Sequence, residues 1–286
     1  MLIDPLVSVI ILHTQSAQYL PTLLSDLRKQ SYQYVEIIVV DADKTNSNQV
    51  DVLAGQYPEV RFIPYFGEPT FMQMLRSGAK MAKGTYSLVL SIEAQLPRAC
   101  IELMLQHISA HNGKIKTLGL HIFASGYYWR SNPSKTFPWL IRSQKVGPTE
   151  ATSQDYNGSM ANSSAFMVST NSLSEITGNT SFSSEWGFYF WQQKFCRKNG
   201  QKSIAPGISV KTSANMYLGN CSYTENRSEA IAIINTFRLT NPLRYINYLA
   251  YFAFYYGTVI RKMFHRTDKE RSHVHFSGSH AKRFVS

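Results

Sequence analysis

The sequence predicts an α/β protein with a mainly parallel sheet, and two observations carry this prediction. First, short apolar runs rich in Val and Ile alternate with stretches whose apolar residues recur at helical spacing, from residue 7 to residue 123. Second, these runs lack the polar–apolar alternation of a half-exposed strand, as expected for strands buried on both faces. Strands that alternate with helices pair in parallel, so we expect helices on both faces of one sheet.

The elements of this first part follow in order from their local patterns. The expected strands are 7–13, 35–40, 60–63, 86–90 and 117–123. After the first strand, Leu20, Leu23, Leu24 and Leu27 fall on one face of a helix with a 3.6-residue period. Residues 72–81 and 97–111 are expected as helices, because Lys83-Gly84 and Asn112-Gly113 follow them as helix-ending pairs.

The second half of the chain has weaker patterns. Residues 126–160 combine several aromatic residues with Pro and Gly and show no clear period, so we expect a long loop region ordered around a ligand. Beyond it, the patterns predict a strand at 165–169, a helix at 186–198 that ends at Asn199-Gly200, and a last strand at 203–210.

The C-terminal stretch differs from the rest. Residues 245–260 carry no charge and are heavily aromatic, yet the run is shorter than the roughly 20 apolar residues of a transmembrane helix. Residues 261–286 hold seven Lys or Arg and two acids, a net charge of +5. An aromatic helix beside a basic segment is typical of an anchor in the membrane interface. A core-packing helix followed by a solvated tail is the alternative. We expect three parts: 1–215, a helical segment at 216–264, and a basic disordered tail at 265–286.

Composition bounds the function. The chain has 286 residues, 44% hydrophobic and 16% charged, which excludes a disordered protein. Its net charge of +11 favours anionic partners, but no nucleic-acid-binding motif is present, so nucleic acid is not expected. The three cysteines are far apart without metal-ligand spacing, which fits a reduced cytoplasmic setting. No basic region precedes the first apolar run, so we expect no signal peptide.

Polar residues follow three of the expected strands. His13-Thr14-Gln15-Ser16 follows the first, Asp41-Ala42-Asp43 the second, and Ser91-Ile92-Glu93-Ala94 the fourth. Ligands of open parallel sheets bind beyond the carboxyl ends of the strands, where these segments should converge. The pattern therefore indicates a nucleotide site.

Three longer stretches resemble one family. The opening VSVIILHTQSAQYLPTLLSDLRKQSYQYVEIIVVDADKTN, the run GAKMAKGTYSLVLSIEAQLP, and the late stretch SSAFMVSTNSLSEIT with FSSEWGFYFWQQKFCRKNGQKSIAPGISV follow the order and spacing of family 2 glycosyltransferases. The similarity covers roughly residues 5 to 211. It implies the GT-A fold, a Rossmann-like sheet flanked by helices. It also implies transfer of a sugar from a nucleotide-diphosphate sugar to a hydroxyl acceptor, with inversion.

The resemblance also implies roles for matching positions. Thr14 and Gln15 stand where the family's first turn meets the nucleotide, and Asp41, with Asp43 nearby, matches the acid that contacts base or ribose. A helix N-cap or turn residue, whose side chain satisfies amides of the loop, is the alternative for Asp41. Glu93 matches the second acid of the D-x-D motif, which binds Mn²⁺ or Mg²⁺ on the diphosphate, and a solvated loop acid is the alternative. Arg76, on the helix before the fourth strand, is a candidate to neutralise diphosphate, with a surface role as the alternative.

The chain departs from the family where acids are expected. Ser91 replaces the first acid of the D-x-D motif, so a weakened metal site is expected, since hard cations prefer carboxylate oxygens. The stretch 188–191 lacks the acidic pair that supplies the catalytic base, which leaves Glu185 as the nearby carboxylate. Glu185 could equally cap the helix that follows it. Two interpretations stay open: an active transferase, or an inactive relative that binds a glycan or scaffolds a partner.

The resemblance, joined to the aromatic and basic C-terminus, suggests where the protein works. A lipid-linked or surface-glycan acceptor would give a transferase a reason to meet an anionic membrane. We therefore expect a cytoplasmic protein, peripheral on the inner face of the membrane, that takes part in cell-envelope polysaccharide assembly.

Overall fold

The computed structural model describes residues 4–14, 17–43, 47–111, 115–124, 126–133, 141–147, 161, 163–178, 188–189, 191–192, 201–211, 245–253 and 256. The chain divides into two compact units, residues 1–221 and residues 222–286.

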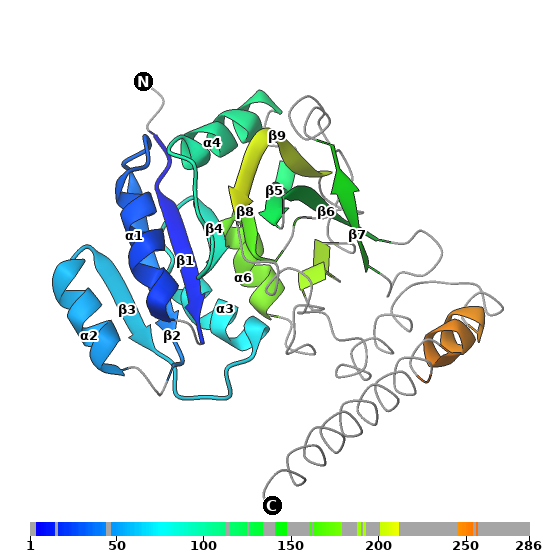
Figure 1. The fold of residues 1–286 in the computed structure, drawn as a ribbon, viewed down its shortest axis with the longest axis horizontal. Coiled ribbons are helices and arrows are strands. Elements are labelled where there is room, and N and C mark those ends of the chain that lie inside the picture. The colour runs from blue at the N-terminus through cyan, green and yellow to red at the C-terminus, as the bar shows by residue number, and fades with distance from the viewer. Residues whose placement is uncertain are drawn as a thin grey trace, which may run out of the picture. The chain divides into compact units, whose positions relative to one another are not determined.

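The first unit is built on one sheet, which Figure 1 shows with its flanking helices. Its described strands are β1 (Val7–His13), β2 (Val35–Asp41), β3 (Val60–Pro64), β4 (Tyr86–Ser91), β5 (Ile115–Ala124), β6 (Tyr127–Pro133), β7 (Ile141–Val146), β8 (Ala165–Ser169) and β9 (Gln201–Lys211). The order across the sheet is β3-β2-β1-β4-β8-β5-β6-β7, and β9 pairs with β5.

The sheet is mainly parallel, as the sequence predicts. Strands β3, β2, β1 and β4 pair in parallel. Strand β8 runs antiparallel between β4 and β5, which restores the direction of β4 in β5 and in its parallel partner β9. Of the described strands, β8 and β6 therefore run against the rest.

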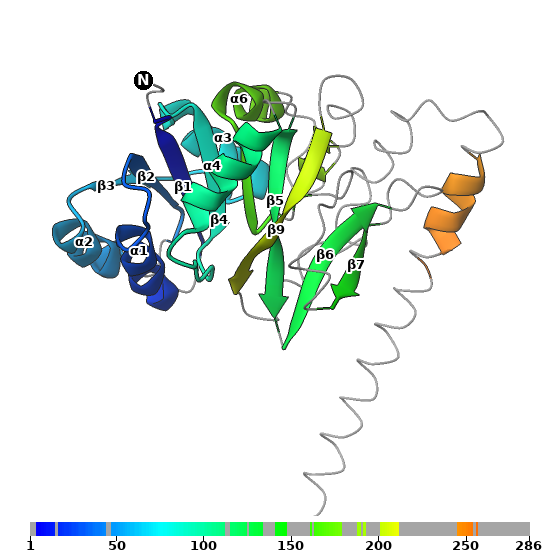
Figure 2. The ribbon, with the colours of Figure 1, turned by 90° about the horizontal axis from the view of Figure 1, so that it is seen from above.

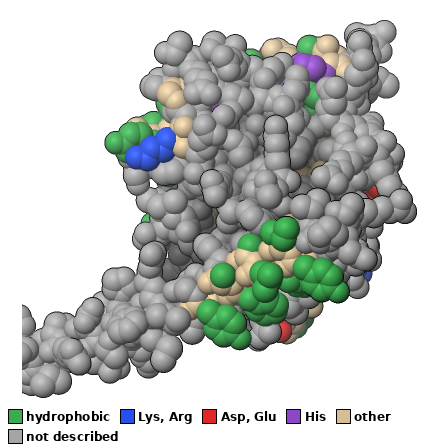
Figure 3. All heavy atoms as spheres, turned by 90° about the vertical axis from the view of Figure 1, so that its right-hand side faces the viewer, with side chains coloured by type: hydrophobic (Ala, Val, Ile, Leu, Met, Phe, Trp, Pro, Cys, Tyr) green, Lys and Arg blue, Asp and Glu red, His purple; other side chains and the backbone are tan. Residues whose placement is uncertain are grey.

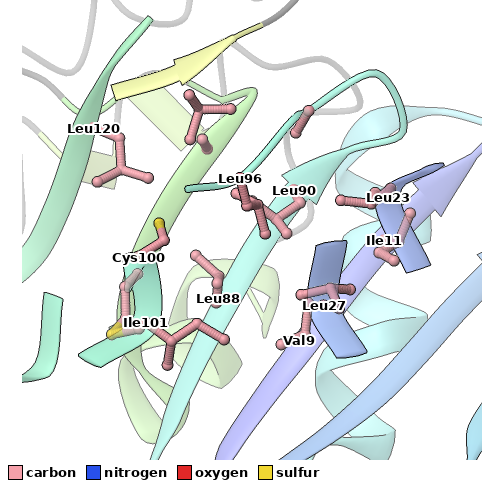
Figure 4. Close-up of a cluster of buried hydrophobic side chains, with 14 of the residues drawn as sticks. Val9, Ile11, Leu23, Leu27, Leu88, Leu90, Leu96, Cys100, Ile101 and Leu120 are labelled. Carbon is pink, nitrogen blue, oxygen red and sulfur yellow. The ribbon is translucent and has the colours of Figure 1, made fainter. Parts of the chain in front are cut away.

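Helices cover both faces of the sheet. On one face, α1 (Leu20–Arg28) and α4 (Cys100–Ala110) pack their apolar side chains against inward residues of β1 and β4, as Figure 4 shows for Leu23, Leu27, Ile101, Val9 and Leu88. On the other face lie α3 (Phe71–Met81) and α6 (Thr170–Gly178), and Figure 2 gives a second view of these layers. The remaining described helices are η1 (Ala17–Tyr19) and α2 (Ser47–Gln56).

Two glycines in the segment before β4 let the chain pass close to β1. A Cβ on Gly84 would stand 2.6 Å from the carbonyl oxygen of Leu6 and 2.7 Å from the amide nitrogen of Ser8. The amide of Gly84 donates instead to Oγ of Ser8 (2.8 Å). A Cβ on Gly78 would lie 2.5 Å from a methyl group of Ile10. Close approach to β1 therefore requires glycine at both positions.

The long loop expected over 126–160 is wrong for the residues described there. Strands β6 and β7 pair antiparallel from Tyr128 opposite Val146 to Pro133 opposite Ile141. The ammonium of Lys145 lies 3.7 Å from the ring centroid of Tyr127 across this pair. Each of these strands is held by its pairing with another strand, so the local sequence shows no periodicity that predicts them. The helix expected over 186–198 is helical at the described residues 188–189 and 191–192.

The second unit is described at one helical segment, residues 245–253 with residue 256. Tyr245 is 69% exposed and Leu249 is 71% exposed, and Ile246 and Tyr256 are also exposed. Figure 3 shows hydrophobic side chains gathered in a strip on this described surface. No described helix is long and apolar enough to cross a membrane.

Candidate functional site

The carboxyl ends of three parallel strands meet at one edge of the sheet. β1 ends at His13, β2 at Asp41 and β4 at Ser91. The register places His13 beside Asp41, and Leu12 beside Ser91. The sequence prediction that these polar strand ends converge is therefore confirmed.

A buried histidine lies between two aspartates at this edge. Nδ1 of His13 lies 2.7 Å from Oδ1 of Asp41, and Nε2 lies 3.8 Å from Oδ2 of Asp43. The His13 side chain is 0% exposed, and those of Asp41 and Asp43 are 14% and 3% exposed. Because a carboxylate only accepts hydrogen bonds, Nδ1 of His13 carries the hydrogen of the shorter contact.

The backbone holds Asp41 in place. Its carbonyl oxygen accepts from the amide of Tyr65 (2.6 Å), and the next amide, that of Ala42, donates to the carbonyl of His13 (2.8 Å). The amide of Asp43 donates to Oδ1 of Asp41 (3.1 Å). Oδ1 thus receives two hydrogen bonds. Oδ2 has no hydrogen-bond partner in the described part of the chain and is available to a ligand.

The turn after β4 carries the other acid of the edge. The amide of Ser91 donates to the carbonyl of Ser164 (2.8 Å), and the amide of Ala94 returns to the carbonyl of Ser91 (3.1 Å). Oγ of Ser91 is buried, and none of the described residues gives it a hydrogen-bond partner. Glu93, inside this turn, is half-buried.

Helix α1 anchors the far side of this turn. Oδ2 of Asp26 accepts from the amide of Leu96 (3.1 Å). Nε2 of Gln30 donates to the carbonyl of Pro97 (2.9 Å), and its Oε1 accepts from the amide of Ile101 (3.3 Å). Asp26 of α1 and Gln30, two residues beyond the end of α1, therefore hold the segment that follows Glu93, and the sequence analysis did not identify these roles.

The remaining predicted residues lie apart or outside the description. Nε of Arg76 donates to the carbonyl of Thr177 (2.7 Å) near the end of α6, which gives this arginine a structural contact. Thr14 is exposed directly after β1. Gln15 and Glu185 lie outside the described residues. The ligand roles of all these residues stay predictions.

The edge offers few oxygen ligands for a divalent cation. Glu93 supplies a carboxylate, and the buried, unpartnered Oγ of Ser91 is a second oxygen two residues away. Across the described ranges, no cluster of three or more His, Cys, Asp or Glu side chains is arranged to hold a metal ion. The residues present therefore fit a cation only if other oxygens, such as those of a diphosphate, complete its shell.

Sequence reasoning placed His13 among the polar residues of this edge but gave it no role of its own. It ends a strand whose other inward residues are apolar, and a polar residue at that place was the available signal. The sequence alone did not show that it touches both aspartates, because that contact depends on the register between β1 and β2.

The sequence model of the family described as "Glycosyl transferase family 2" matches residues 8–177, which is more than half of the chain. The chain belongs to this family. The match begins inside β1 and ends inside α6, so it contains the whole described edge with His13, Asp41 and Glu93. The resemblance read from the sequence is therefore confirmed, and a transferase is the class of protein that the family supports.

A curated relative and a solved structure agree with this assignment. The glycosyltransferase GlyG of Streptococcus pneumoniae serotype 4 (strain ATCC BAA-334 / TIGR4) is 25% identical over 172 residues, which are 58% of this chain and 55% of GlyG. The chain thus matches about half the length of that relative. A crystal structure of GalNAc-T7 with UDP, GalNAc and Mn²⁺ is similar with a TM-score of 0.56 and 16% identity, covering 73% of this chain and 43% of that one. This likeness shows the fold, which is of the GT-A type.

Proposed function

We propose that this family 2 glycosyltransferase moves a sugar from a nucleotide-diphosphate sugar to a hydroxyl of a glycan or lipid-linked acceptor. The observation that carries the proposal is the convergence of Asp41, Asp43 and the Ser91–Glu93 turn at the carboxyl edge of the sheet. An acceptor oxygen at Asp41 suits the hydrogen-donor groups of a nucleoside, and an acid on the neighbouring turn suits a cation bound to diphosphate.

The donor would lie along this edge. Asp41 would accept from the nucleoside with Asp43 behind it, and Thr14 and Gln15 would line the first turn. Glu93 and Oγ of Ser91 would hold Mn²⁺ or Mg²⁺, whose charge helps the diphosphate to leave. The UDP and Mn²⁺ named for the GalNAc-T7 structure support this choice of ligands. Arg76 would lend positive charge from α3.

Transfer with inversion needs a base for the acceptor. In the proposed step, the acceptor oxygen bonds to the anomeric carbon while the bond from that carbon to the diphosphate breaks. The carboxylate of Glu185 would take the proton of the acceptor hydroxyl, because a base must lie within hydrogen-bond reach of it.

A second function is favoured by one specific observation. The turn after β4 has a serine where the family has an acid, so a single carboxylate, that of Glu93, is present on it. A chain with so few metal ligands could bind a nucleotide or glycan without transferring sugar. Such a protein would act as a glycan-binding or scaffold protein.

The experiment that separates these functions combines binding with turnover. The melting temperature is measured with UDP-, GDP- and dTDP-sugars, with and without Mn²⁺, because a ligand of the native state stabilises it by mass action. Hydrolysis and transfer are followed with the donor that binds best. Glu93→Gln should abolish the metal-dependent shift, and Glu185→Gln should abolish transfer while donor binding remains.

The matched control is Glu175→Gln, an exposed acid on α6, which should change neither result. Binding without any transfer would favour the non-catalytic function. No shift with any donor would refute the proposed transferase and would leave glycan binding or scaffolding as the function.

We also propose that the second unit docks on the inner face of an anionic membrane, in the cytoplasm. The exposed apolar side chains of Tyr245, Ile246 and Leu249 precede a C-terminal sequence, residues 261–286, that carries seven Lys or Arg and two acids. Apolar insertion and attraction to acidic lipids reinforce each other at a membrane surface. This arrangement would bring the enzyme to a lipid-linked acceptor of surface-glycan assembly.

Vesicle sedimentation tests this docking. The protein should pellet with vesicles that contain acidic lipid, and less so with neutral vesicles or in high salt. Leu249→Glu should weaken binding about tenfold or more, since burying an added charge in the interface is costly. Val52→Glu, on α2 of the first unit and similarly exposed, is the matched control. Equal binding by the Leu249 and Val52 variants would contradict the proposal.

A further inference from the structure

We propose that His13 is a positioning residue that holds Asp41 so that its second carboxylate oxygen faces the nucleoside. The inference rests on the proposed function, because it assigns a role within the same nucleotide site. Neither the family's motif nor the names of the similar proteins assign a role to this histidine.

The hydrogen bonds at Asp41 give its two oxygens different tasks. Nδ1 of His13 (2.7 Å) and the amide of Asp43 (3.1 Å) both donate to Oδ1. Two donors on one oxygen fix the rotation of the carboxylate. Oδ2 is then left as the acceptor for a ligand, on a side chain that is 14% exposed.

The far side of the imidazole supports the same arrangement. Nε2 of His13 lies 3.8 Å from Oδ2 of Asp43, which is too far for a hydrogen bond. The ring therefore stands between two carboxylates that would otherwise repel each other. Without it, Oδ1 of Asp41 would keep only the hydrogen bond from the amide of Asp43, and repulsion from the Asp43 carboxylate would favour its turning away from the position that a nucleoside needs.

Burial shows that His13 is a costly choice at this position. Val9 and Ile11, which precede it on the same face of β1, are fully buried apolar side chains. Another apolar side chain at position 13 would bury no polar nitrogen, whereas Nε2 of His13 is buried without a hydrogen bond from any described residue. A polar side chain that costs stability here is accounted for by its effect on Asp41.

Two polar substitutions of similar size distinguish a role of His13 in positioning Asp41 from a purely structural role. The amide nitrogen of asparagine falls near the place of Nδ1, so His13→Asn can still donate to Asp41. The longer glutamine places its amide nearer to Nε2, so His13→Gln loses that bond. Isothermal titration uses UDP, GDP or dTDP, whichever the unaltered protein binds most tightly.

We expect His13→Gln to weaken nucleotide binding about tenfold, the effect of one hydrogen bond to a charged group. His13→Asn should keep most of the affinity. The control is Ser87→Ala, which removes another buried hydrogen bond of the sheet, to Thr170 (2.9 Å), away from this edge. It should lower the melting temperature and leave nucleotide affinity unchanged.

A double-mutant cycle tests whether the effect passes through Asp41. In an Asp41→Ala background, His13→Gln should add less than about twofold, because residues that act as a unit are not additive. Equal affinities for the Asn, Gln and unaltered proteins would overturn the inference, and so would a full tenfold effect in the Asp41→Ala background. If the unaltered protein binds none of the three nucleotides, the proposed function itself fails. The two failures are thus distinguishable.

Discussion

The polar contacts of Gln30 allow a quantitative prediction of how much this side chain, which holds the segment after Glu93, contributes to stability. The Gln30 side chain is 2% exposed. Its Nε2 donates to the carbonyls of Asp26 (3.2 Å) and Pro97 (2.9 Å), and its Oε1 accepts from the amide of Ile101 (3.3 Å). The contact with Ile101 satisfies an amide in the first turn of α4, which has no partner within its own helix.

Gln30→Ala should therefore be strongly destabilising. The buried amide of Ile101 loses its partner, at a cost of about 1–3 kcal/mol. The carbonyl of Pro97 keeps the bond from the amide of Cys100 (3.0 Å) and loses one hydrogen bond, worth about 0.5–1.5 kcal/mol. We expect the free energy of unfolding to fall by about 3 kcal/mol. The melting temperature should fall by about 6–12 °C, at about 2–4 °C per kcal/mol for this size.

Urea unfolding followed by circular dichroism measures this change. The matched control is Gln106→Ala, because Gln106 is exposed on α4 and its side chain donates to Oε1 of Glu102, one turn away (3.3 Å). Its effect should stay within about 0.5 kcal/mol. Gln30→Glu should destabilise at neutral pH at least as much as alanine, because it places a buried charge against a carbonyl. A Gln30→Ala effect no larger than that of the control would refute the reasoning.

Three further predictions use contacts elsewhere in the first unit. Gly84→Ala should lower the free energy of unfolding by about 1–3 kcal/mol, because its Cβ would meet backbone atoms at 2.6 and 2.7 Å. Gly55→Ala is the control, because a Cβ at this position of α2 meets open space, and it should raise the free energy of unfolding by about 0.4–1 kcal/mol. Thermal melts measure both changes. Burial raises the pKa of the Cys100 thiol to about 12, so peptide mapping should find Cys100 unalkylated by iodoacetamide at pH 8 until the protein unfolds. The hydrogen bond from Arg28 lowers the pKa of Glu59 below 4.5, so the stability from this pair is present above that pH and is lost as the pH falls through the lowered pKa. Arg28→Gln should therefore lower the melting temperature slightly at pH 7 and not at pH 2, and an equal loss at both would contradict the ionic origin.

The strands at the centre of the sheet were predictable because buried strands are rich in apolar residues. β1, β2 and β4 are covered on both faces, so each is mostly apolar and lacks a regular polar–apolar alternation. Their polar ends also indicated where a ligand would lie, since parallel strands end at the same edge. Asp41 and Glu93 were identified in this way.

The strand order was not predictable from local patterns. β8 enters the sheet antiparallel between β4 and β5, although β5 follows β4 directly among the strands along the chain. β6 and β7 pair with each other, and no periodicity in residues 126–160 predicted these strands. Such pairings follow from contacts between distant segments, which a local pattern does not record.

By itself, the sequence determined the fold class, the family and the edge of the sheet that carries the candidate site, because apolar runs and strand-end residues are local properties. The tertiary structure decided which polar groups meet there. Register set His13 against Asp41, and the packing of α1 beside the start of α4 set Gln30 against Pro97, 67 residues away. Hydrogen bonds depend on distances of a few tenths of an ångström, and those distances exist only once segments far apart in the chain have packed together.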